Sequence, residues 1–342
     1  MITKQTRLHK AVSIHLKKID NNDFTQPEIQ RNIEKYGVKV DDLDVFNRLF
    51  WVLPGQSVQI NNWPKRDHGD FDKIKILEES DKFLLLFKPF GVVVQPGAGH
   101  LKDNLVMWLL AKYPELEKFD PIDYPSRGLA HRIDKNTQGL LLVAKDIETL
   151  DLFQSQFKRR EVVKKYLCIV EGLLDQQYTV KAYQSRDKLD VKRQKMFWTR
   201  ETSQAYDAKS RFAHSMIKPL AVCPELDQTL VEVEIKTGRM HQIRLHMQAI
   251  EHPLVGDHVY NKKILDLAKA EQKAIEFDCG WHSFYPSVNV KKVSASVFLN
   301  YKKTIFDDEN YCLLSNQLKI TLPDNKILDA EIINIEDFNL VL

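Results

Sequence analysis

The sequence lacks the features that mark secreted, disulfide-bonded and membrane-spanning proteins. Its 342 residues include only four cysteines, and they lie far apart. We therefore expect Cys168, Cys223, Cys279 and Cys312 to be reduced thiols, as in a cytoplasmic protein. The N-terminal residues contain no apolar segment typical of a secretion signal, and no apolar run approaches the ~20 residues that cross a bilayer. We expect a cytoplasmic protein with no membrane partner.

Metal and nucleotide motifs are also missing. The stretch "KPFGVVVQPGAG" lacks the GK[ST] ending of a phosphate-binding loop, and no dinucleotide fingerprint occurs elsewhere. His241 and His246 are five residues apart, whereas a zinc-binding helix needs a spacing of four, and no cysteine lies near them. We expect neither a metal nor a cofactor, so any reaction catalysed by this chain must need none.

The charges nearly balance, with a formal net charge of +3 and an isoelectric point near 8.4. A surface that binds nucleic acid must therefore be a local patch. Charged residues make up 28% of the chain and hydrophobic residues 43%, as in a globular protein rather than a disordered one. The length suggests two domains.

Residues 1–62 predict a small module of two helices and a pair of short strands. Apolar residues from Leu8 to Ile19 follow helical spacing. Thr25 and Glu28 form a capping-box pattern for a second helix, which Gly37 should end. The segments "VKV" and "SVQI" are typical of short strands. The polar stretch that follows, residues 63–72, is the predicted linker.

Residues 73–342 predict an α+β domain with a mixed, mainly antiparallel central sheet flanked by helices. Strand-like runs include "GLLLVAK", "KKYLCIVEG" and "TLVEVEIKTGR". We also interpret "SASVFLNYKK" and "LKITLPDNKILDAEIINI" as closing strands. Residues 261–293 are predicted to be an irregular insertion, and residues 305–342 form a tail without a recognisable pattern.

A polar cluster interrupts the apolar stretch "LAHRIDKNTQGLLLVAKD". Asp134 and Arg132 taken alone favour an ordinary ion pair. The functional alternative is an ionised carboxylate in a site that excludes water. Burial would raise the pKa of a carboxyl group, and a nearby guanidinium would oppose that change. Arg132 and Arg244 are both candidates for the guanidinium.

Two further stretches leave structural and functional readings open. If "HQIRLH" is a strand, Arg244 and His246 share a face, and Arg244 could hold a carboxylate or a phosphate. Tyr166 lies on the predicted strand "KKYLCIVEG". It is either a core aromatic residue or a platform on which a base stacks.

Together these stretches resemble the ribosomal large-subunit pseudouridine synthases of the RluA type. The resemblance rests on four motifs in the family's order. They correspond to KPxGxxVxPG, HRLDxxTSG, KxYxAxVxG and TGRxHQIRVH…HPxxGDxxY, found here at 88–97, 131–139, 164–172 and 237–260. The chain departs from the pattern at Ile133, where the family has Leu, at Gln138, where it has Ser, and at Cys168, where it has Ala. The N-terminal module resembles the small RNA-binding module named after ribosomal protein S-four.

The resemblance implies a pseudouridine synthase fold and a role for each site residue. Asp134 would be the nucleophile that acts on the ribose–base linkage of the target uridine. Arg132 would fill the space left by the flipped nucleotide, and Tyr166 would pack on the flipped uracil. Arg244 would pair with Asp134 and keep it ionised. His131 and Thr137, in the same motif as Asp134, are expected to support the site.

The resemblance also implies RNA as the partner, most often large-subunit rRNA, bound by a monomer. Isomerising a uridine needs no redox partner, but the base must leave its stack, at a cost of a few kcal/mol. Whether the carboxylate attacks the anomeric carbon or removes a ribose proton stays open. The alternatives are a non-catalytic RNA-binding assembly factor and a cofactor-free hydrolase of small molecules. The residues expected to contact RNA are Arg7, Lys10, Lys17, Arg31, Lys35, Arg239 and His241.

Overall fold

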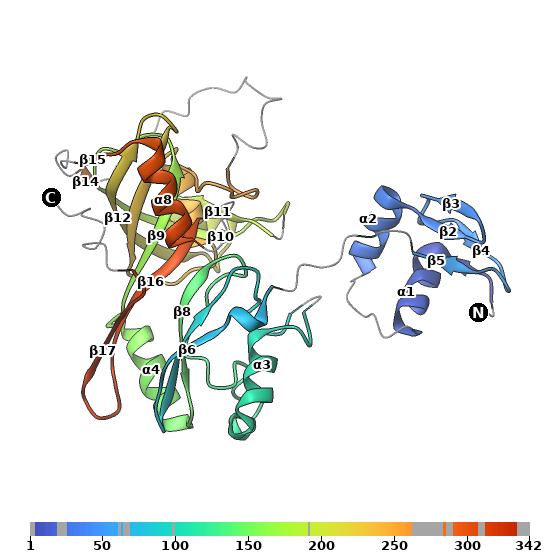
Figure 1. The fold of residues 1–342 in the computed structure, drawn as a ribbon, viewed down its shortest axis with the longest axis horizontal. Coiled ribbons are helices and arrows are strands. Elements are labelled where there is room, and N and C mark those ends of the chain that lie inside the picture. Colours follow the sequence, from blue (N-terminus) through green and yellow to red (C-terminus); the bar gives the residue numbers. More distant parts are fainter. Residues whose placement is uncertain are drawn as a thin grey trace. The chain divides into compact units, whose positions relative to one another are not determined.

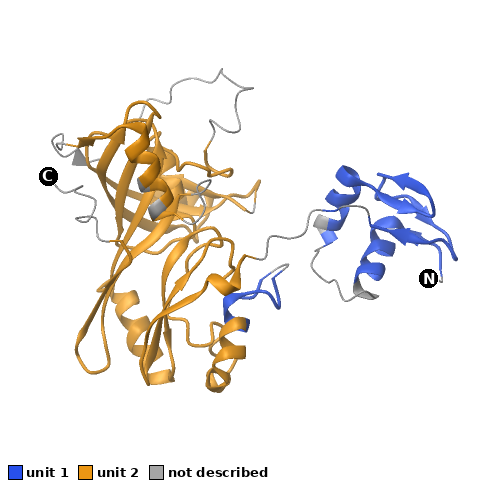
Figure 2. Cartoon of the chain, in the orientation of Figure 1, with its two compact units in different colours: residues 1–68, 95–107 blue, residues 69–94, 108–342 orange. Residues whose placement is uncertain are grey.

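The structure is a computed structural model with two compact units. It describes residues 4–18, 26–60, 63, 69–97, 100–190, 192–261, 283–284, 290–306 and 312–333. One unit comprises residues 1–68 with 95–107, and the other comprises residues 69–94 with 108–342 (Figure 2). The first boundary falls inside the stretch 63–72.

The first unit packs two helices on short strands. Helix α1 buries Leu8 and Val12, and helix α2 buries Ile29 and Ile33 in the same apolar cluster. Gly37 ends α2 with φ of +71°, a conformation that costs glycine little. The elements are β1 (Thr6–Arg7), α1 (Leu8–Lys18), α2 (Gln26–Tyr36), β2 (Val38–Val40), β3 (Leu43–Val45), β4 (Trp51–Val52) and β5 (Val58–Gln59).

Both predicted helices and both predicted strands of this unit are confirmed, and β2 pairs with β5. The sequence did not predict β1, β3 and β4, which are two or three residues long. Such short strands carry too little alternation to be recognised. The predicted capping box lies outside the described residues, because Thr25 is not described.

The second unit is built on one large sheet (Figure 1). The elements from residue 69 onwards include seven α- and 3-10 helices: η1 (Phe71–Lys73), α3 (Leu105–Lys112), η2 (Pro114–Lys118), α4 (Ile147–Arg159), α5 (Arg200–Tyr206), α6 (Gln242–Ala249) and α8 (Ala295–Ile305). The strands are β6 (Lys75–Glu79), β7 (Phe83–Lys88), β8 (Gln138–Ala144), β9 (Val163–Glu171), β10 (Tyr178–Arg186), β11 (Gln194–Phe197), β12 (Arg211–Cys223), β13 (Gln228–Ile235), β14 (Ser283–Phe284), β15 (Lys291–Lys292), β16 (Leu313–Thr321) and β17 (Ile327–Glu331).

The sheet runs in the order β11-β10-β12-β13-β9-β16-β8-β7-β6. Neighbours along this path are antiparallel, except that β16 is parallel to β8. The α+β prediction with a mainly antiparallel central sheet is therefore confirmed. Helix α8 adds Phe298 to the core on one face of the sheet, and helix α4 packs against β16, where Gln156 donates a hydrogen bond to the Thr321 carbonyl.

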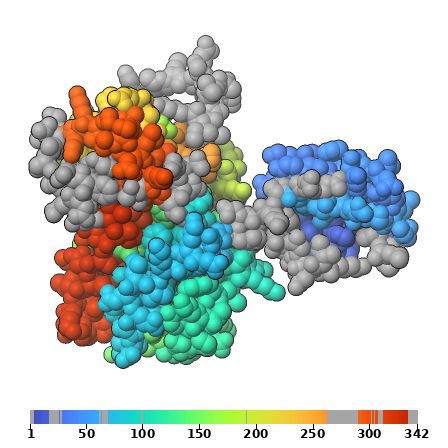
Figure 3. Space-filling model, in the orientation of Figure 1, coloured from blue at the N-terminus to red at the C-terminus, as the bar shows by residue number. Residues whose placement is uncertain are grey.

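The segment predicted to be a tail provides the strand that joins the two halves of this sheet. Strand β16 lies between β8 and β9, and β17 pairs with its outer part. Gly139 of β8 allows the backbone of β16 to come close to β8. It has φ of +118°, and a Cβ atom there would lie 2.3 Å from the Ser315 carbonyl oxygen. Figure 3 shows the β16–β17 hairpin, in red, beside the cyan strand β6, and residues of both line one groove.

Two segments considered as strands are helices. The residues that follow His241 in "HQIRLH" belong to helix α6, so the condition under which Arg244 and His246 would share a strand face is not met. Every residue from Gln242 to Met247 is buried, and a helix buried all round shows no stripe of period 3.6. The predicted strand "SASVFLNYKK" is helix α8, where Phe298 and Ile305, two turns apart, enter the core.

Three of the four cysteines, Cys168, Cys223 and Cys312, are buried thiols. The fourth, Cys279, lies outside the described residues, as does most of the predicted insertion 261–293. Strand β14 is described within that insertion and pairs with β10. Among the described residues, no helix is long and apolar enough to cross a membrane.

Candidate active site

The polar cluster around Asp134 occupies a loop that folds back on strand β8. The backbone amide of Ala130 donates to the Leu142 carbonyl at 2.9 Å, and that of Ala144 donates to Gly128 at 2.8 Å. Inside the loop, the Thr137 amide donates to the Asp134 carbonyl at 3.1 Å. The apolar flanks of the cluster thus form the base on which the loop is fixed.

A buried lysine, Lys88, anchors the backbone of this loop. The Nζ atom of Lys88 donates hydrogen bonds to the carbonyls of Pro89 at 2.8 Å, Val92 at 2.9 Å and Lys135 at 2.9 Å. Lys88 is 0% exposed, and its burial lowers its pKa to about 7 against the opposing charge of Asp134. The sequence showed this lysine at the start of "KPFG" but gave no sign that it reaches residue 135.

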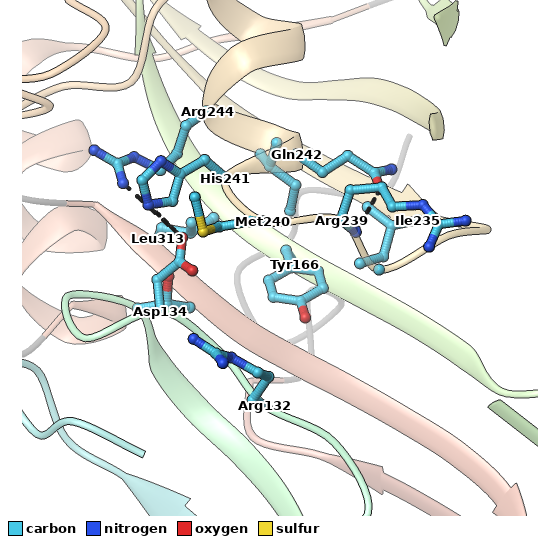
Figure 4. A pocket seen from close by; sticks show the side chains of 13 residues that line it. Arg132, Asp134, Tyr166, Ile235, Arg239, Met240, His241, Gln242, Arg244 and Leu313 are labelled. Carbon is cyan, nitrogen blue, oxygen red and sulfur yellow. Dashed lines mark hydrogen bonds and ion pairs between the residues drawn. The ribbon is translucent and has the colours of Figure 1, made fainter. Parts of the chain in front are cut away.

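A cavity of about 240 Å³ opens beside the loop. Figure 4 shows the carboxylate of Asp134 directed towards Arg244 and His241. Elements far apart in the sequence meet here, because α6, β9, β16 and the Asp134 loop all supply side chains. Seven of the predicted site residues line the cavity: Arg132, Asp134, Thr137, Tyr166, Arg239, His241 and Arg244.

Arg244 joins two carboxylates. Its Nη1 atom lies 3.9 Å from the Asp134 carboxylate. Its closer partner is Asp257, to which Nε and Nη2 donate at 2.7 and 2.8 Å in a bidentate pair. Burial alone would raise the pKa of Asp257, but Arg244 and the amides of Val259 and Tyr260 outweigh it, so the pKa is lowered.

The bidentate pair fixes the guanidinium that faces Asp134. A planar guanidinium matches a carboxylate at two points, so its orientation is set as well as its position. Asp257 was not predicted as a site residue. It stands in the stretch "HPLVGD", and the sequence alone does not show that this turn returns to α6.

His241 contacts Asp134 from the start of α6. Its Nε2 atom lies 3.9 Å from the carboxylate, and its Nδ1 atom lies 3.0 Å from the Tyr260 hydroxyl. The residue adopts φ of +57°, a left-handed conformation that turns the chain from β13 into the helix. Burial lowers the pKa of His241, and the attraction of Asp134 opposes this change.

Tyr166 forms an apolar wall of the cavity. It lies at the centre of the sheet, where β9 pairs with Val233 of β13 and Ser315 of β16. The side chain is buried, and this burial raises its pKa to about 12, so the phenol stays neutral at physiological pH. An aromatic ring fixed at a cavity wall can stack on a planar base.

The profile of the RNA pseudouridylate synthase family matches residues 82–249, which contain the Asp134 loop, Tyr166 and Arg244. The chain is 34% identical over 251 residues to an uncharacterised RNA pseudouridine synthase of Bacillus subtilis, YlyB. That alignment covers 72% of this chain and 78% of the Bacillus protein. The chain belongs to the RNA pseudouridine synthase family.

Two other similarities agree with this assignment. A ribosomal large subunit pseudouridine synthase D of Pseudomonas aeruginosa is 34% identical over 229 residues, covering 66% of this synthase and 64% of that protein. The human protein RNA pseudouridylate synthase domain containing 1 shares the fold, with a TM-score of 0.50 and 18% identity. The structural match covers 78% of this synthase and 85% of the human chain.

His131 of the synthase does not line the cavity, although it was predicted to support the site. Its ring stacks against Phe157 with 4.9 Å between centroids, and Nε2 accepts a hydrogen bond from the Leu142 amide at 3.2 Å. Burial, and then the charge of Lys164, lower its pKa to about 3. The ring is therefore neutral and fixes the base of the loop.

Gln138 faces away from the site of the synthase. It is buried, and its Nε2 atom donates to the Ile305 carbonyl at 3.2 Å. Successive residues of a strand point to opposite faces, so Thr137 lines the cavity while Gln138 lines the groove beside β17. Gln138, one of the three residues that depart from the family pattern, therefore packs behind the active site.

The remaining predicted RNA contacts belong to the first unit. Arg7 lies over the Trp51 ring, 3.9 Å from its centroid, and donates to the Leu49 carbonyl. Lys35 lies over the Tyr36 ring at 5.0 Å. Lys10 and Arg31 are exposed, and the side chain of Lys17 is outside the description.

Proposed function

We propose that this synthase isomerises specific uridines of large-subunit rRNA, with Asp134 as the catalytic nucleophile. The observation that carries the proposal is the position of the Asp134 carboxylate. It lies at the cavity with Arg244 and His241 each 3.9 Å away, beside the ring of Tyr166. Attack on the anomeric carbon and removal of a ribose proton both need an ionised carboxylate. Arg244, held by Asp257, supplies the positive charge that attracts it.

The size of the cavity supports a flipped nucleotide as the ligand. Its volume of about 240 Å³ lies below the ~300–1,000 Å³ typical of drug-sized ligand sites. Such a cavity suits one extruded nucleotide, and the energy of extrusion is smallest for a base that is already unpaired. In this proposal Tyr166 stacks on the uracil, and Arg132 occupies the space that the nucleotide leaves.

The names of the similar proteins support rRNA as the substrate. Several of them, including the Pseudomonas protein, are large-subunit synthases. We propose further that residues 1–62 form an S-four-like RNA-binding module, joined by residues 63–72 to a catalytic domain over 73–342. The exposed cations of this N-terminal module, Lys10 and Arg31 among them, would contact RNA. The enzyme would act as a monomer in the cytoplasm.

A pseudouridine map of total RNA from cells with and without the gene tests this function. We expect one or a few pseudouridines of large-subunit rRNA to disappear, and to return when the wild-type gene is restored. Loss of tRNA sites alone would make tRNA the substrate. An unchanged map, together with binding of the purified protein to rRNA, would favour the non-catalytic assembly factor.

A further inference from the structure

A group of cations lies along one side of the cavity mouth. Lys164 precedes Tyr166 by two residues on β9, so both side chains point to the same face, about 7 Å apart along the strand. Lys164 is only 9% exposed. Its Nζ atom reaches the cavity rim, because a Cβ atom on Gly238 would lie 4.0 Å from it.

Other cations converge on Lys164. Arg160 stands at the left-handed end of helix α4, and Arg239 lines the cavity next to Gly238. Burial, and then the charges of Arg239, Arg160 and Lys236, lower the pKa of Lys164 to about 8. Arg239 has its own pKa lowered by burial, then by Arg211 and Arg160. These side chains therefore repel one another across a partly desolvated surface.

Acidic partners do not relieve this repulsion. Within the part of the chain that the structure describes, Arg160, Lys164, Arg211 and Arg239 have no carboxylate within ion-pair distance. Adjacent cations are paired, since Lys165 contacts Glu232 and Lys236 contacts Glu234. The guanidinium of Arg239 is also oriented, because its Nε donates to the Phe212 carbonyl at 2.9 Å.

We propose that Arg160, Lys164 and Arg239 bind a backbone phosphate of the RNA strand that places its uridine in the cavity. A phosphate would supply the missing negative charge and accept hydrogen bonds from all three side chains. A nucleotide in the cavity carries its own phosphates to the mouth, where Gly238 and Arg239 lie. The inference rests on the proposed function for the identity of the anion, but it concerns a surface outside the Asp134 loop.

Binding measured without turnover tests this site. The full chain with Asp134→Asn is the background, and the probe is a fluorescein-labelled single-stranded oligouridine titrated at several salt concentrations. Arg160→Gln and Lys164→Met should each weaken binding several-fold at low salt. Each should also reduce the slope of log K against log salt by up to about 0.7, the value for complete loss of one phosphate contact on a single strand.

Lys326→Gln is the matched control, because it removes one positive charge at the exposed turn between β16 and β17. It should leave the slope within error of the background. A second probe carries uncharged methylphosphonate linkages, and on it the variants and the background should bind alike. Arg160 is exposed, so its variant keeps the test valid if Lys164→Met fails to fold.

The site is refuted if Arg160→Gln, folded by circular dichroism, changes the slope no more than Lys326→Gln does. It is also refuted if the variants still differ on the uncharged probe, since the cations would then act on something other than phosphate. Neither result depends on pseudouridine formation. A failure of the proposed function would appear in the RNA map and a failure of this site in the salt slope.

Discussion

Replacing Asp257 by asparagine should destabilise the second unit strongly. Asp257 is 0% exposed, and the Arg244 side chain is 9% exposed. Removing one partner of a buried ion pair costs about 3–5 kcal/mol, because the other charge stays buried without compensation. The asparagine oxygen can still accept hydrogen bonds from the Val259 and Tyr260 amides and from Nη2 of Arg244, but its amide nitrogen would face the Nε donor of Arg244. In a domain of this size we expect a fall in Tm of roughly 10 °C.

A double-mutant cycle with Arg244→Met isolates the interaction energy between Asp257 and Arg244 from the effects of each residue on the rest of the site. Urea-induced unfolding of the four proteins, followed by circular dichroism, gives each free energy of unfolding. The double variant buries no unpaired charge, so it should lose at least ~2 kcal/mol less than the sum of the single losses. If Asp257→Asn loses less than ~1 kcal/mol, or if the losses add, Asp257 does not hold Arg244 as described.

Three further predictions concern residues around the site. Lys88→Met removes the hydrogen-bond donor from three buried carbonyls, so it should lower the free energy of unfolding, measured with urea, by about 3 kcal/mol. It should also lower the single-turnover rate, because the Asp134 loop loses its support. Burial holds the pKa of His246 at about 3, so the unfolded chain binds a proton below pH 6.5 that the folded chain does not. Stability should therefore fall as the pH drops from 6.5 towards 3, by up to ~1.4 kcal/mol per unit from this residue, and His246→Gln should reduce that slope in unfolding titrations. Gln138→Ser removes the hydrogen bond to Ile305 behind the cavity, so it should cost about 1 kcal/mol of stability while kcat/KM stays within about twofold; a large fall in kcat/KM would place Gln138 in the site after all.

Local patterns in the sequence predicted the parts of the fold that show clear periodicity. Strand β9 was predicted from "KKYLCIVEG", and helix α1 from the apolar spacing after Leu8. The sequence did not decide between helix and strand for α6, because its residues are buried on every side and show no stripe of helical period. The place of β16 between β8 and β9 depends on contacts across more than 140 residues, which no local pattern encodes.

In the candidate site too, some features could be predicted from the sequence and others depend on long-range contacts. The sequence predicted that Asp134, Tyr166 and Arg244 would meet, and the cavity brings them together. It could not predict that Asp257 is the bidentate partner of Arg244, because that pairing depends on how the turn after β13 and α6 closes. The backbone contacts of Lys88 could not be predicted for the same reason, since the residue type alone does not show whether a lysine is buried or exposed.

The test of the central claim is pseudouridine formation by Asp134→Asn. The Asp134 side chain is 24% exposed and Asn has nearly its shape, so the variant should fold and bind RNA like the wild type. The amide cannot act as a nucleophile or as a base, so single-turnover conversion of the rRNA site found by mapping should be undetectable. Conversion at the wild-type rate by the folded variant would contradict the role of Asp134.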